Sequence, residues 1–220
     1  MMRGRFITLE GIEGAGKSTV VAALAAAIRS RGYEVVTTRE PGGTPLAELL
    51  RETVLQRGRE HVAPETETLL MFASRAVHLD NLVRPALARG AWVVCDRFTD
   101  ATRAYQGGGR GVERTFIESM ARVIHRDTEP DLTLLLDLPV ATGLERARRR
   151  RSAAREAVAD RFESESLEFF ARVRARYLEI AAAEPQRVRV LDATQSAAQV
   201  AAAAVAAVET LAAGDAPRSQ

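Results

Sequence analysis

Short apolar runs alternate along this chain with longer segments whose apolar residues recur at helical spacing. Runs rich in apolar and β-branched residues are typical of buried strands; they span Phe6–Glu10, Glu34–Thr38, Ala91–Cys95, Leu132–Asp137 and Val188–Leu191. Helices are predicted between and after them, with Pro64 and Pro85 as breaks, at Ser18–Arg31, Leu46–Leu55, Glu65–Ala88, Arg114–Ile124, Ala141–Arg151, Leu167–Ala183 and Ser196–Ala213. This alternation predicts an α/β fold in three layers: a five-stranded parallel sheet with helices on both faces.

The size and composition of the chain fit one globular domain. Its 220 residues are 46% hydrophobic and 27% charged, which is close to the globular average. We expect residues 1–213 to form the domain and residues 214–220 to be a flexible tail. No apolar run is long enough for a membrane span, and the N-terminus lacks the apolar core of a signal peptide. The single cysteine, Cys95, suits a reducing compartment, so we expect a cytoplasmic protein with no membrane partner.

The charge pattern argues against a nucleic-acid partner. The formal net charge is +2 and aromatic residues make up 5% of the chain, whereas nucleic-acid-binding domains usually carry a strong basic stripe. The densest basic run, Arg146–Arg151, is local and suits a small polyanion. Nearly every cationic side chain is an arginine, and Lys17 is the only lysine. A lone lysine in such a chain indicates a specific task.

The most informative motif joins the first predicted strand to the first predicted helix. Residues 11–18, GIEGAGKS, match the phosphate-binding pattern G-x-x-x-x-G-K-[ST] in the context that the pattern requires. Backbone N–H groups and the helix N-terminus attract phosphate oxygens, Lys17 reaches the β- and γ-phosphates, and the Ser18 hydroxyl ligates Mg²⁺. We therefore expect ATP to contact Gly11, Ile12, Glu13, Gly14, Ala15, Gly16, Lys17, Ser18 and Thr19.

This loop by itself occurs in kinases, switch GTPases and motor ATPases. A GTPase would need an Asn-Lys-x-Asp motif for its base, and a chain with no second lysine cannot contain one. DNA-translocase and transporter ATPases are usually larger. A small P-loop NTPase with further arginine-rich loops favours a kinase that acts on a small metabolite.

Polar segments follow the predicted strands, where ligands bind in parallel sheets. TREPGGT (38–44) follows the second strand, and DRF (96–98) and AYQGGGRG (104–111) follow the third; a helix between them carries LLMFASRA (69–76). Together with FITLEGIEGAGKST, PDLTLLLDLP and DRFE, these motifs resemble bacterial thymidylate kinase over about residues 6–194.

The resemblance implies a binding site for dTMP. It implies that Arg97 grips the acceptor phosphate, that Phe72 stacks on thymine and that Arg75 donates to a thymine carbonyl oxygen. Spacing of i, i+3 puts Phe72 and Arg75 on one helix face. Thr102 would meet N3 of the base, and Tyr105 would pack beneath the sugar and crowd out a 2′-hydroxyl. The other residues that the resemblance assigns to dTMP are Arg39, Glu40, Pro41 and Gln106.

The resemblance also implies the catalytic groups. Asp96 would position Mg²⁺, directly or through water, together with Ser18. Some family members carry an arginine in the phosphate loop, but this chain has Glu13 there, as in the subtype whose catalytic arginine lies in a lid. The lid is expected at about residues 146–163, with Arg150 as the best match. Glu13 would face the acceptor 3′-hydroxyl or a Mg²⁺-bound water, and the catalytic set would be Lys17, Arg97, Arg150 and Glu13.

Two departures from the family pattern affect these assignments. The family often has a serine where this chain has Ala101, so a hydroxyl near the acceptor is missing. Residues 152–159 look inserted in the lid, which leaves the catalytic arginine open among Arg148, Arg150, Arg151 and Arg155.

The function implied is phosphorylation of dTMP to dTDP with ATP and Mg²⁺, which supplies dTTP for DNA synthesis, in a homodimer as in the family. Two alternatives stay open at this point: another nucleoside monophosphate or deoxynucleoside kinase, and a non-catalytic nucleotide-binding module.

Overall fold

The fold is organised around one parallel sheet. The computed structural model describes residues 3–55, 60–154, 162 and 165–213, so the expected tail at 214–220 lies outside the described residues. The strand order is β2-β3-β1-β4-β5, and every neighbouring pair is parallel. The strands are β1 (Phe6–Glu10), β2 (Val35–Arg39), β3 (Trp92–Asp96), β4 (Leu132–Asp137) and β5 (Val188–Asp192). This confirms the predicted five-stranded α/β fold, with no strand end displaced by more than one residue.

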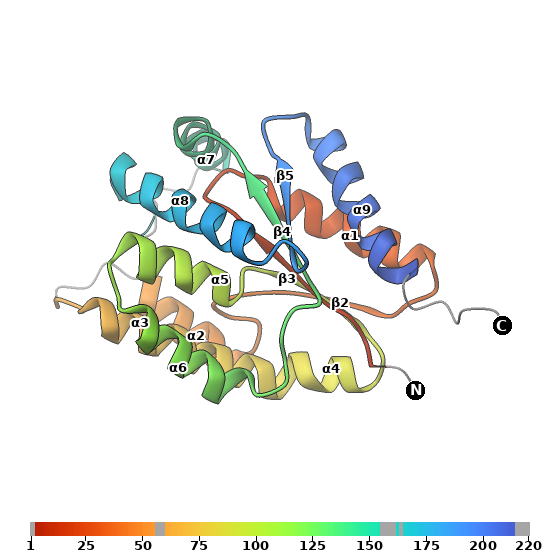
Figure 1. Ribbon diagram of the computed structural model, residues 1–220, viewed down its shortest axis with the longest axis horizontal. Helices are drawn as coiled ribbons and strands as arrows, with labels where there is room; N and C mark the ends of the chain where they lie inside the picture. The colour runs from red at the N-terminus through yellow and green to blue at the C-terminus, as the bar shows by residue number, and fades with distance from the viewer. Residues whose placement is uncertain (1–2, 56–59, 155–161, 163–164, 214–220) are drawn as a thin grey trace.

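Helices cover both faces of the sheet (Figure 1): α1 and α9 lie on one side, and α3, α5, α6 and α8 on the other. The α-helices are α1 (Lys17–Ser30), α2 (Pro45–Leu55), α3 (Pro64–His78), α4 (Arg84–Ala88), α5 (Thr99–Thr102), α6 (Arg114–His125), α7 (Val140–Ala154), α8 (Leu167–Ala183) and α9 (Ala197–Ala213). Two π-helical segments are η1 (Leu79–Val83) and η2 (Arg103–Gly109). Within the described part of the chain, a helix suited to crossing a membrane is not found.

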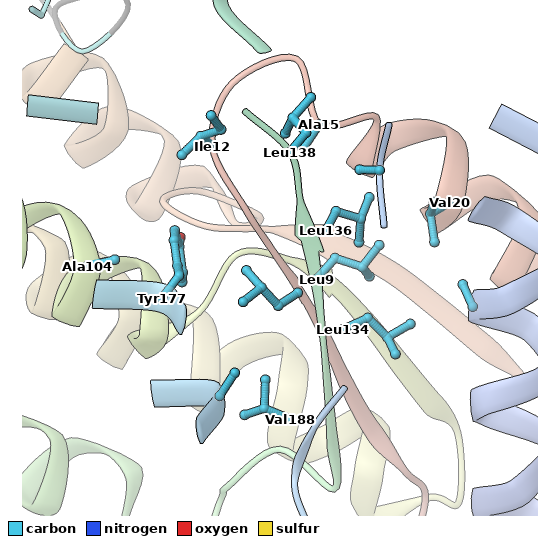
Figure 2. Close-up of a cluster of buried hydrophobic side chains, with 14 of the residues drawn as sticks. Leu9, Ile12, Ala15, Val20, Ala104, Leu134, Leu136, Leu138, Tyr177 and Val188 are labelled. Carbon is cyan, nitrogen blue, oxygen red and sulfur yellow. The ribbon is translucent and has the colours of Figure 1, made fainter. Parts of the chain in front are cut away.

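The central strands are buried on both faces, which explains their continuous apolar sequences. Leu9 of β1 and Leu134 and Leu136 of β4 are almost completely buried, with Val20 of α1 in the same cluster (Figure 2). Burying one such side chain contributes about 1.5–3 kcal/mol. The end of β1 therefore gives the phosphate loop a rigid starting point.

The single helix predicted at Glu65–Ala88 is instead α3, η1 and α4 in succession. Pro85 explains the change, because proline has no N–H to donate to a preceding carbonyl. Just before Pro85 the helical turn contains one residue more than in an α-helix, because the Arg84 N–H donates to the carbonyl of Leu79, five residues earlier. The helical direction continues through the proline by this local π geometry.

The segment Thr99–Gly109 is helical, although its glycine-rich sequence predicted no helix. Tertiary contact explains this. A Cβ on Gly108 would lie 2.7 Å from Cβ of Arg176, and one on Gly109 would lie 2.4 Å from the Phe169 ring. The glycines thus let α8 pack directly on η2, and the segment forms one wall of the site described next.

Candidate functional site

A cleft of about 380 Å³ opens at the carboxyl ends of β1, β2 and β3. The phosphate loop, the segment after β2, helix α3 and the α5–η2 segment form its walls. Of the residues predicted from the sequence, it brings together Glu13, Gly14, Ala15, Gly16, Lys17, Ser18, Arg39, Glu40, Pro41, Arg75, Asp96, Arg97, Thr102, Tyr105, Gln106 and Arg150. Four predicted residues do not line it: Gly11, Ile12, Thr19 and Phe72.

Backbone crowding explains two of the three glycines in the phosphate loop. Gly11 has φ of +134°, and a Cβ there would lie 2.5 Å from the Leu136 carbonyl oxygen. Gly14 has φ of +73°, and its Cβ would lie 2.0 Å from the carbonyl oxygen of Gly143 at the start of α7. A side chain at either position would displace the loop from β4 or α7, so both glycines fix the loop before any ligand arrives.

Lys17 lies folded over its own loop. Its ammonium donates to the carbonyl oxygens of Gly11 and Ile12 at 3.0 and 3.1 Å. Burial and the nearby Arg97 lower the pKa of Lys17 to about 8, although neighbouring carboxylates oppose the shift. The lysine is therefore a desolvated cation held weakly at the cleft, where a polyphosphate would compensate it better than two carbonyl groups do.

Arg97 lies at the centre of the cleft in an unusual backbone conformation, with φ of 72°. Its guanidinium donates to Glu13 at 3.1 Å and to the Tyr105 hydroxyl at 3.0 Å, and lies over the Tyr105 ring at 4.8 Å. The Tyr105 hydroxyl in turn donates to both Glu13 oxygens at 2.8 Å. A non-glycine residue at positive φ costs free energy and is often found at functional sites. The guanidinium is thus fixed with a carboxylate as its anionic partner.

Glu10, at the end of β1, supports this arrangement from below, and the sequence prediction did not include it. One carboxylate oxygen accepts from the backbone N–H groups of Phe98 and Ala101 at 2.7 and 3.3 Å. The other accepts from the Tyr177 hydroxyl at 2.7 Å, and that hydroxyl accepts from Arg97 at 3.3 Å. The only feature of the sequence that could have indicated this role is the single acidic residue at the end of a largely apolar strand.

Glu10 should make stability depend on pH. Burial, aided by Asp100, raises its pKa from 4.5 to about 7, against the effects of Arg97, Tyr177 and Phe98 N–H. Between these two pH values the folded state binds more protons than the unfolded state, so stability falls as pH rises through the window. As the pH rises through this window, we expect the free energy of unfolding, measured by denaturant titration, to fall in the wild type. The fall should exceed that of Glu10→Gln by on the order of 3 kcal/mol. Parallel profiles for the two proteins would contradict this.

Arg75 lies on the cleft wall with two of its three nitrogens occupied. Nε donates to Glu40 at 2.7 Å and Nη2 donates to the Thr102 hydroxyl at 3.1 Å. Nη1 is buried and has no hydrogen-bond partner. The guanidinium lies over the rings of Phe72 and Phe98, at 4.8 and 5.2 Å from their centroids. Because a buried donor without a partner is costly, this nitrogen is suited to a ligand oxygen.

Phe72, which the resemblance implies stacks on thymine, is almost completely buried. Its side chain is 1% exposed and packs with Val112, Ile117 and Ala121, against α6 and the segment before it. The prediction that it shares a helix face with Arg75 is confirmed, but the guanidinium covers its ring. The side chains on the cleft surface are those of Met71, one position earlier, and Phe98. Stacking of the base on Phe72 stays a prediction.

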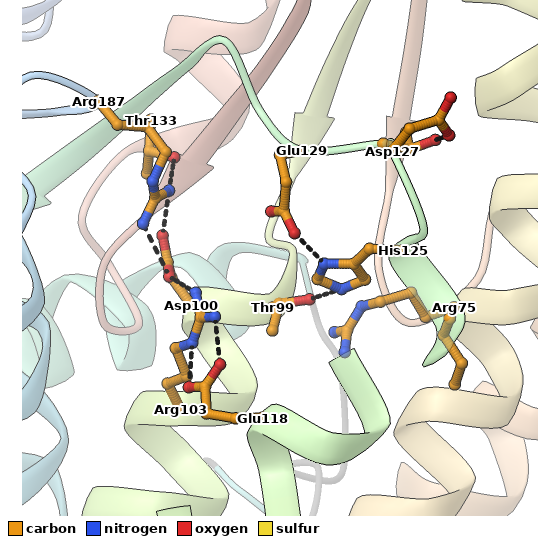
Figure 3. Close-up of polar contacts among 12 residues, drawn as sticks. Arg75, Thr99, Asp100, Arg103, Glu118, His125, Asp127, Glu129, Thr133 and Arg187 are labelled. Carbon is orange, nitrogen blue, oxygen red and sulfur yellow. Dashed lines mark hydrogen bonds and ion pairs between the residues drawn. The ribbon is translucent and has the colours of Figure 1, made fainter. Parts of the chain in front are cut away.

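The far side of α5 is anchored by a buried ionic network (Figure 3). Asp100 accepts from Arg103 at 2.8 Å and from Arg187 at 2.7 Å. Arg187 also donates to Thr133 of β4 at 2.7 Å, and Thr99 bonds to the buried ring of His125 at 2.6 Å. These bonds tie the α5 wall to β4 and α6, which keeps its cleft side in place.

The start of the expected lid is helical. Helix α7 continues to Ala154, and Arg150 is the arginine of this helix that lines the cleft. Arg148 and Arg151, the other candidates on α7, do not line it, and Arg155 lies outside the described residues. Phe162 closes the cleft beside Tyr105, with ring centroids 5.8 Å apart at 86°.

Several wall residues were not predicted from the sequence: Arg51, Leu55, Met71, Phe98 and Phe162. Arg51 donates to the carbonyl oxygen of Pro41 at 2.9 Å, which links α2 to the segment after β2. Arg51 and Leu55 are spaced i, i+4 on α2, so they share a face, and this spacing was the only available signal.

Comparisons with known proteins agree with one another. The family model described as thymidylate kinase matches residues 9–204. A thymidylate kinase of Pseudomonas fluorescens is 56% identical over 96% of this chain and 97% of its own length. One from Nitrosomonas europaea is 52% identical over 95% and 94%. The crystal structure of a thymidylate kinase from Ehrlichia chaffeensis superposes with a TM-score of 0.74 at 30% identity, covering 94% of this chain and 99% of that one.

Proposed function

We propose that the cleft described above holds both nucleotides for direct transfer. The chain belongs to the thymidylate kinase family, and it uses ATP to convert dTMP to dTDP. The observation that carries the proposal is that Lys17 and Arg97 line the same cleft. The phosphate loop would hold the triphosphate of ATP, and Arg97 would hold the phosphate of dTMP. Each cation now contacts a weaker protein partner that a phosphate can replace.

The thymine base would lie between Arg75, Met71 and Phe98. The unpartnered Nη1 of Arg75 supports a hydrogen bond to a carbonyl oxygen of the base. Thr102 lies beside it and already accepts from the same guanidinium. Tyr105, held through its hydroxyl by Glu13, supports the inference that the sugar lies over its ring and that a 2′-hydroxyl is crowded there.

The reaction we infer is in-line attack by a phosphate oxygen of dTMP on the γ-phosphorus of ATP. The new O–P bond forms as the bond to the β,γ-bridging oxygen breaks, and ADP leaves. The attacking oxygen is already ionised at neutral pH, so the protein needs no strong base. Its contribution is positioning and charge stabilisation: Arg97 orients the acceptor, and Lys17 neutralises charge on the transferred group.

The residues present fit a Mg²⁺ ion. Oδ1 of Asp96 is buried without a hydrogen-bond partner, and Ser18 lies exposed at the cleft. Both are oxygen donors, which Mg²⁺ prefers, and it usually takes few protein ligands beside substrate phosphates. We infer that Ser18 and Asp96 hold it, directly or through water. When bound, the ion supplies neutralisation of phosphate charge.

Glu13 in the phosphate loop and Arg150 at the cleft support assignment to the subtype with a lid arginine. Arg150 would add positive charge at the transferred phosphoryl group. The cytoplasmic location inferred from the sequence stays a prediction.

A panel of nucleoside monophosphates tests the base and sugar contacts. We expect kcat/KM for dTMP to exceed those for dCMP and UMP by at least about 10²-fold, because polar mismatches at a site leave buried groups unpaired. An amino group on the base of dCMP would oppose the Arg75 donor, and the 2′-hydroxyl of UMP would meet Tyr105. Turnover of either one ahead of dTMP would refute these assignments.

We also propose that the chain forms a homodimer through α2, α3 and α6, which pack side by side (Figure 1). Four of the seven large apolar side chains exposed among the described residues lie on these helices: Leu46, Leu49, Leu69 and Val123. Apolar side chains gathered on one part of a surface are typical of protein interfaces.

Two matched valine variants test the dimer. Val123 on α6 is 69% exposed and Val190 on β5 is 49% exposed. We expect Val123→Glu to shift the mass measured by light scattering from dimer to monomer, because an unpaired carboxylate would be buried in the interface. Val190→Glu should leave the mass unchanged. A wild-type monomer, or a dimer that survives the α6 variant, would contradict the proposed interface.

A further inference from the structure

Behind the base-binding wall lies a buried histidine that the reaction described above does not use. His78, the last residue of α3, is completely buried. Its Nδ1 lies 2.8 Å from Oε1 of Glu40, and its Nε2 lies 2.8 Å from the Thr38 hydroxyl. The other oxygen of Glu40 accepts from Nε of Arg75 at 2.7 Å. Four buried or half-buried side chains therefore form one continuous hydrogen-bonded chain from β2 to the cleft.

The chemistry of Glu40 fixes the direction of the two bonds that reach it. Burial alone would raise the pKa of Glu40, but Arg75 and His78 more than offset it and hold the pKa below its ordinary value. An ionised carboxylate only accepts hydrogen bonds, so His78 donates from Nδ1. The Thr38 hydroxyl bonds to the other ring nitrogen, Nε2.

The loop after β2 covers the histidine closely. Gly43 has φ of +90°, and a Cβ there would lie 2.5 Å from the Thr38 hydroxyl and 2.8 Å from Nε2 of His78. Only glycine allows the backbone to lie against this bond. The second glycine of TREPGGT is thus explained by its contact with a histidine 35 residues further along the chain (78 − 43).

We propose that His78 is a positioning residue for dTMP recognition: it holds Glu40, and Glu40 holds Arg75 with its Nη1 directed to the ligand. This inference rests on the proposed role of Arg75. His78 contacts no substrate itself. Without its N–H, one Glu40 oxygen would lack a donor in a buried site, which is costly. Glu40 would then attract Nη1 of Arg75, the nitrogen that we assign to the base.

Two variants of similar polarity separate positioning from packing. In His78→Asn the amide nitrogen can take the place of Nδ1 and still donate to Glu40. In His78→Gln it takes the place of Nε2 and reaches Thr38 instead. We expect His78→Gln and His78→Ala to raise the KM for dTMP on the order of tenfold, with kcat and the KM for ATP within about twofold. His78→Asn should stay within about threefold of wild type.

A packing role predicts the opposite order, because glutamine is closer to histidine in volume than asparagine is. Equal KM values for the two variants, better retention by His78→Gln, or parallel losses for both substrates would overturn the proposal. The His78 substitutions could lower the melting temperature too far for assay, and Thr38→Val is the variant for that case, because it replaces only the hydroxyl by a methyl group. It should raise the KM for dTMP severalfold. An unchanged KM would refute the proposed series of hydrogen bonds from Thr38 to Arg75. The exposed His61→Asn serves as the control.

Arg75→Ala distinguishes this proposal from the one it rests on. If Arg75→Ala leaves the KM for dTMP unchanged, the proposed role of Arg75 is wrong, and the inference about His78 is wrong with it. If Arg75→Ala raises the KM for dTMP, but the KM values of the His78 variants follow side-chain volume, only the inference about His78 fails.

Discussion

Arg97→Ala should lower kcat/KM for dTMP on the order of 10³-fold, because an arginine directed at a reacting phosphoryl group contributes about that much in related transfers. The dissociation constant for ATP should change by less than about threefold. The guanidinium of Arg97 contacts Glu13, Tyr105 and Tyr177, and we assign it to the phosphate of dTMP and not to the triphosphate. A φ of 72° is as unfavourable for alanine as for arginine, so the substitution removes the guanidinium without changing the backbone strain at this position.

Arg97→Lys is the matched control for charge. A lysine keeps the positive charge but not the planar pair of donors that suits a phosphate, so it should recover only part of the lost activity. Equal losses of dTMP use and ATP affinity in Arg97→Ala would contradict the role assigned to Arg97. Titration of each nucleotide against each variant, together with steady-state rates, decides between these outcomes.

Lys17→Ala should lower kcat by on the order of 10²- to 10³-fold, since removing one pre-positioned donor to developing charge typically has an effect of this size. It should also weaken ATP binding while leaving the dissociation constant for dTMP nearly unchanged. The substitution removes the bonds from Lys17 to the Gly11 and Ile12 carbonyl oxygens. The loop should nevertheless keep its shape, because Gly11 and Gly14 also pack against Leu136 and Gly143.

Lys17→Met keeps most of the apolar stem and removes the ammonium. We expect it to be as inactive as Lys17→Ala but closer to wild type in melting temperature. Activity retained by either variant would show that the lysine is not required for transfer, and loss of dTMP binding as strong as loss of ATP binding would contradict the division of the cleft between two nucleotides.

The sheet and the phosphate loop could be predicted from the sequence because their signals are local. Runs such as LTLLLD are apolar on both faces only when a strand is buried on both faces, and β4 has that burial. Of the two glycines that the G-x-x-x-x-G-K-[ST] spacing contains, Gly11 is required by crowding against β4, and Gly16 is favoured by its φ of +92°.

The missed features depend on tertiary contacts. Spacing predicted that Phe72 and Arg75 share a face, and they do, but it could not tell which of them would border the cleft. That depends on α6 and on Val112 just before it, which bury Phe72. The glycines of η2 look unfavourable for a helix until α8 is packed on them. Glu10 was hidden because its partners are distant in sequence, at Phe98 and Tyr177.

The most direct test of the two-nucleotide cleft is a crystal structure with dTMP and a non-hydrolysable ATP analogue bound together. We expect the phosphate of dTMP to replace Glu13 as the anionic partner of Arg97, and Nη1 of Arg75 to donate to a base carbonyl oxygen. The triphosphate should lie on the loop with the Lys17 ammonium directed to it. A dTMP phosphate away from Arg97, with Arg97 still bonded to Glu13 and Tyr105, would contradict this arrangement.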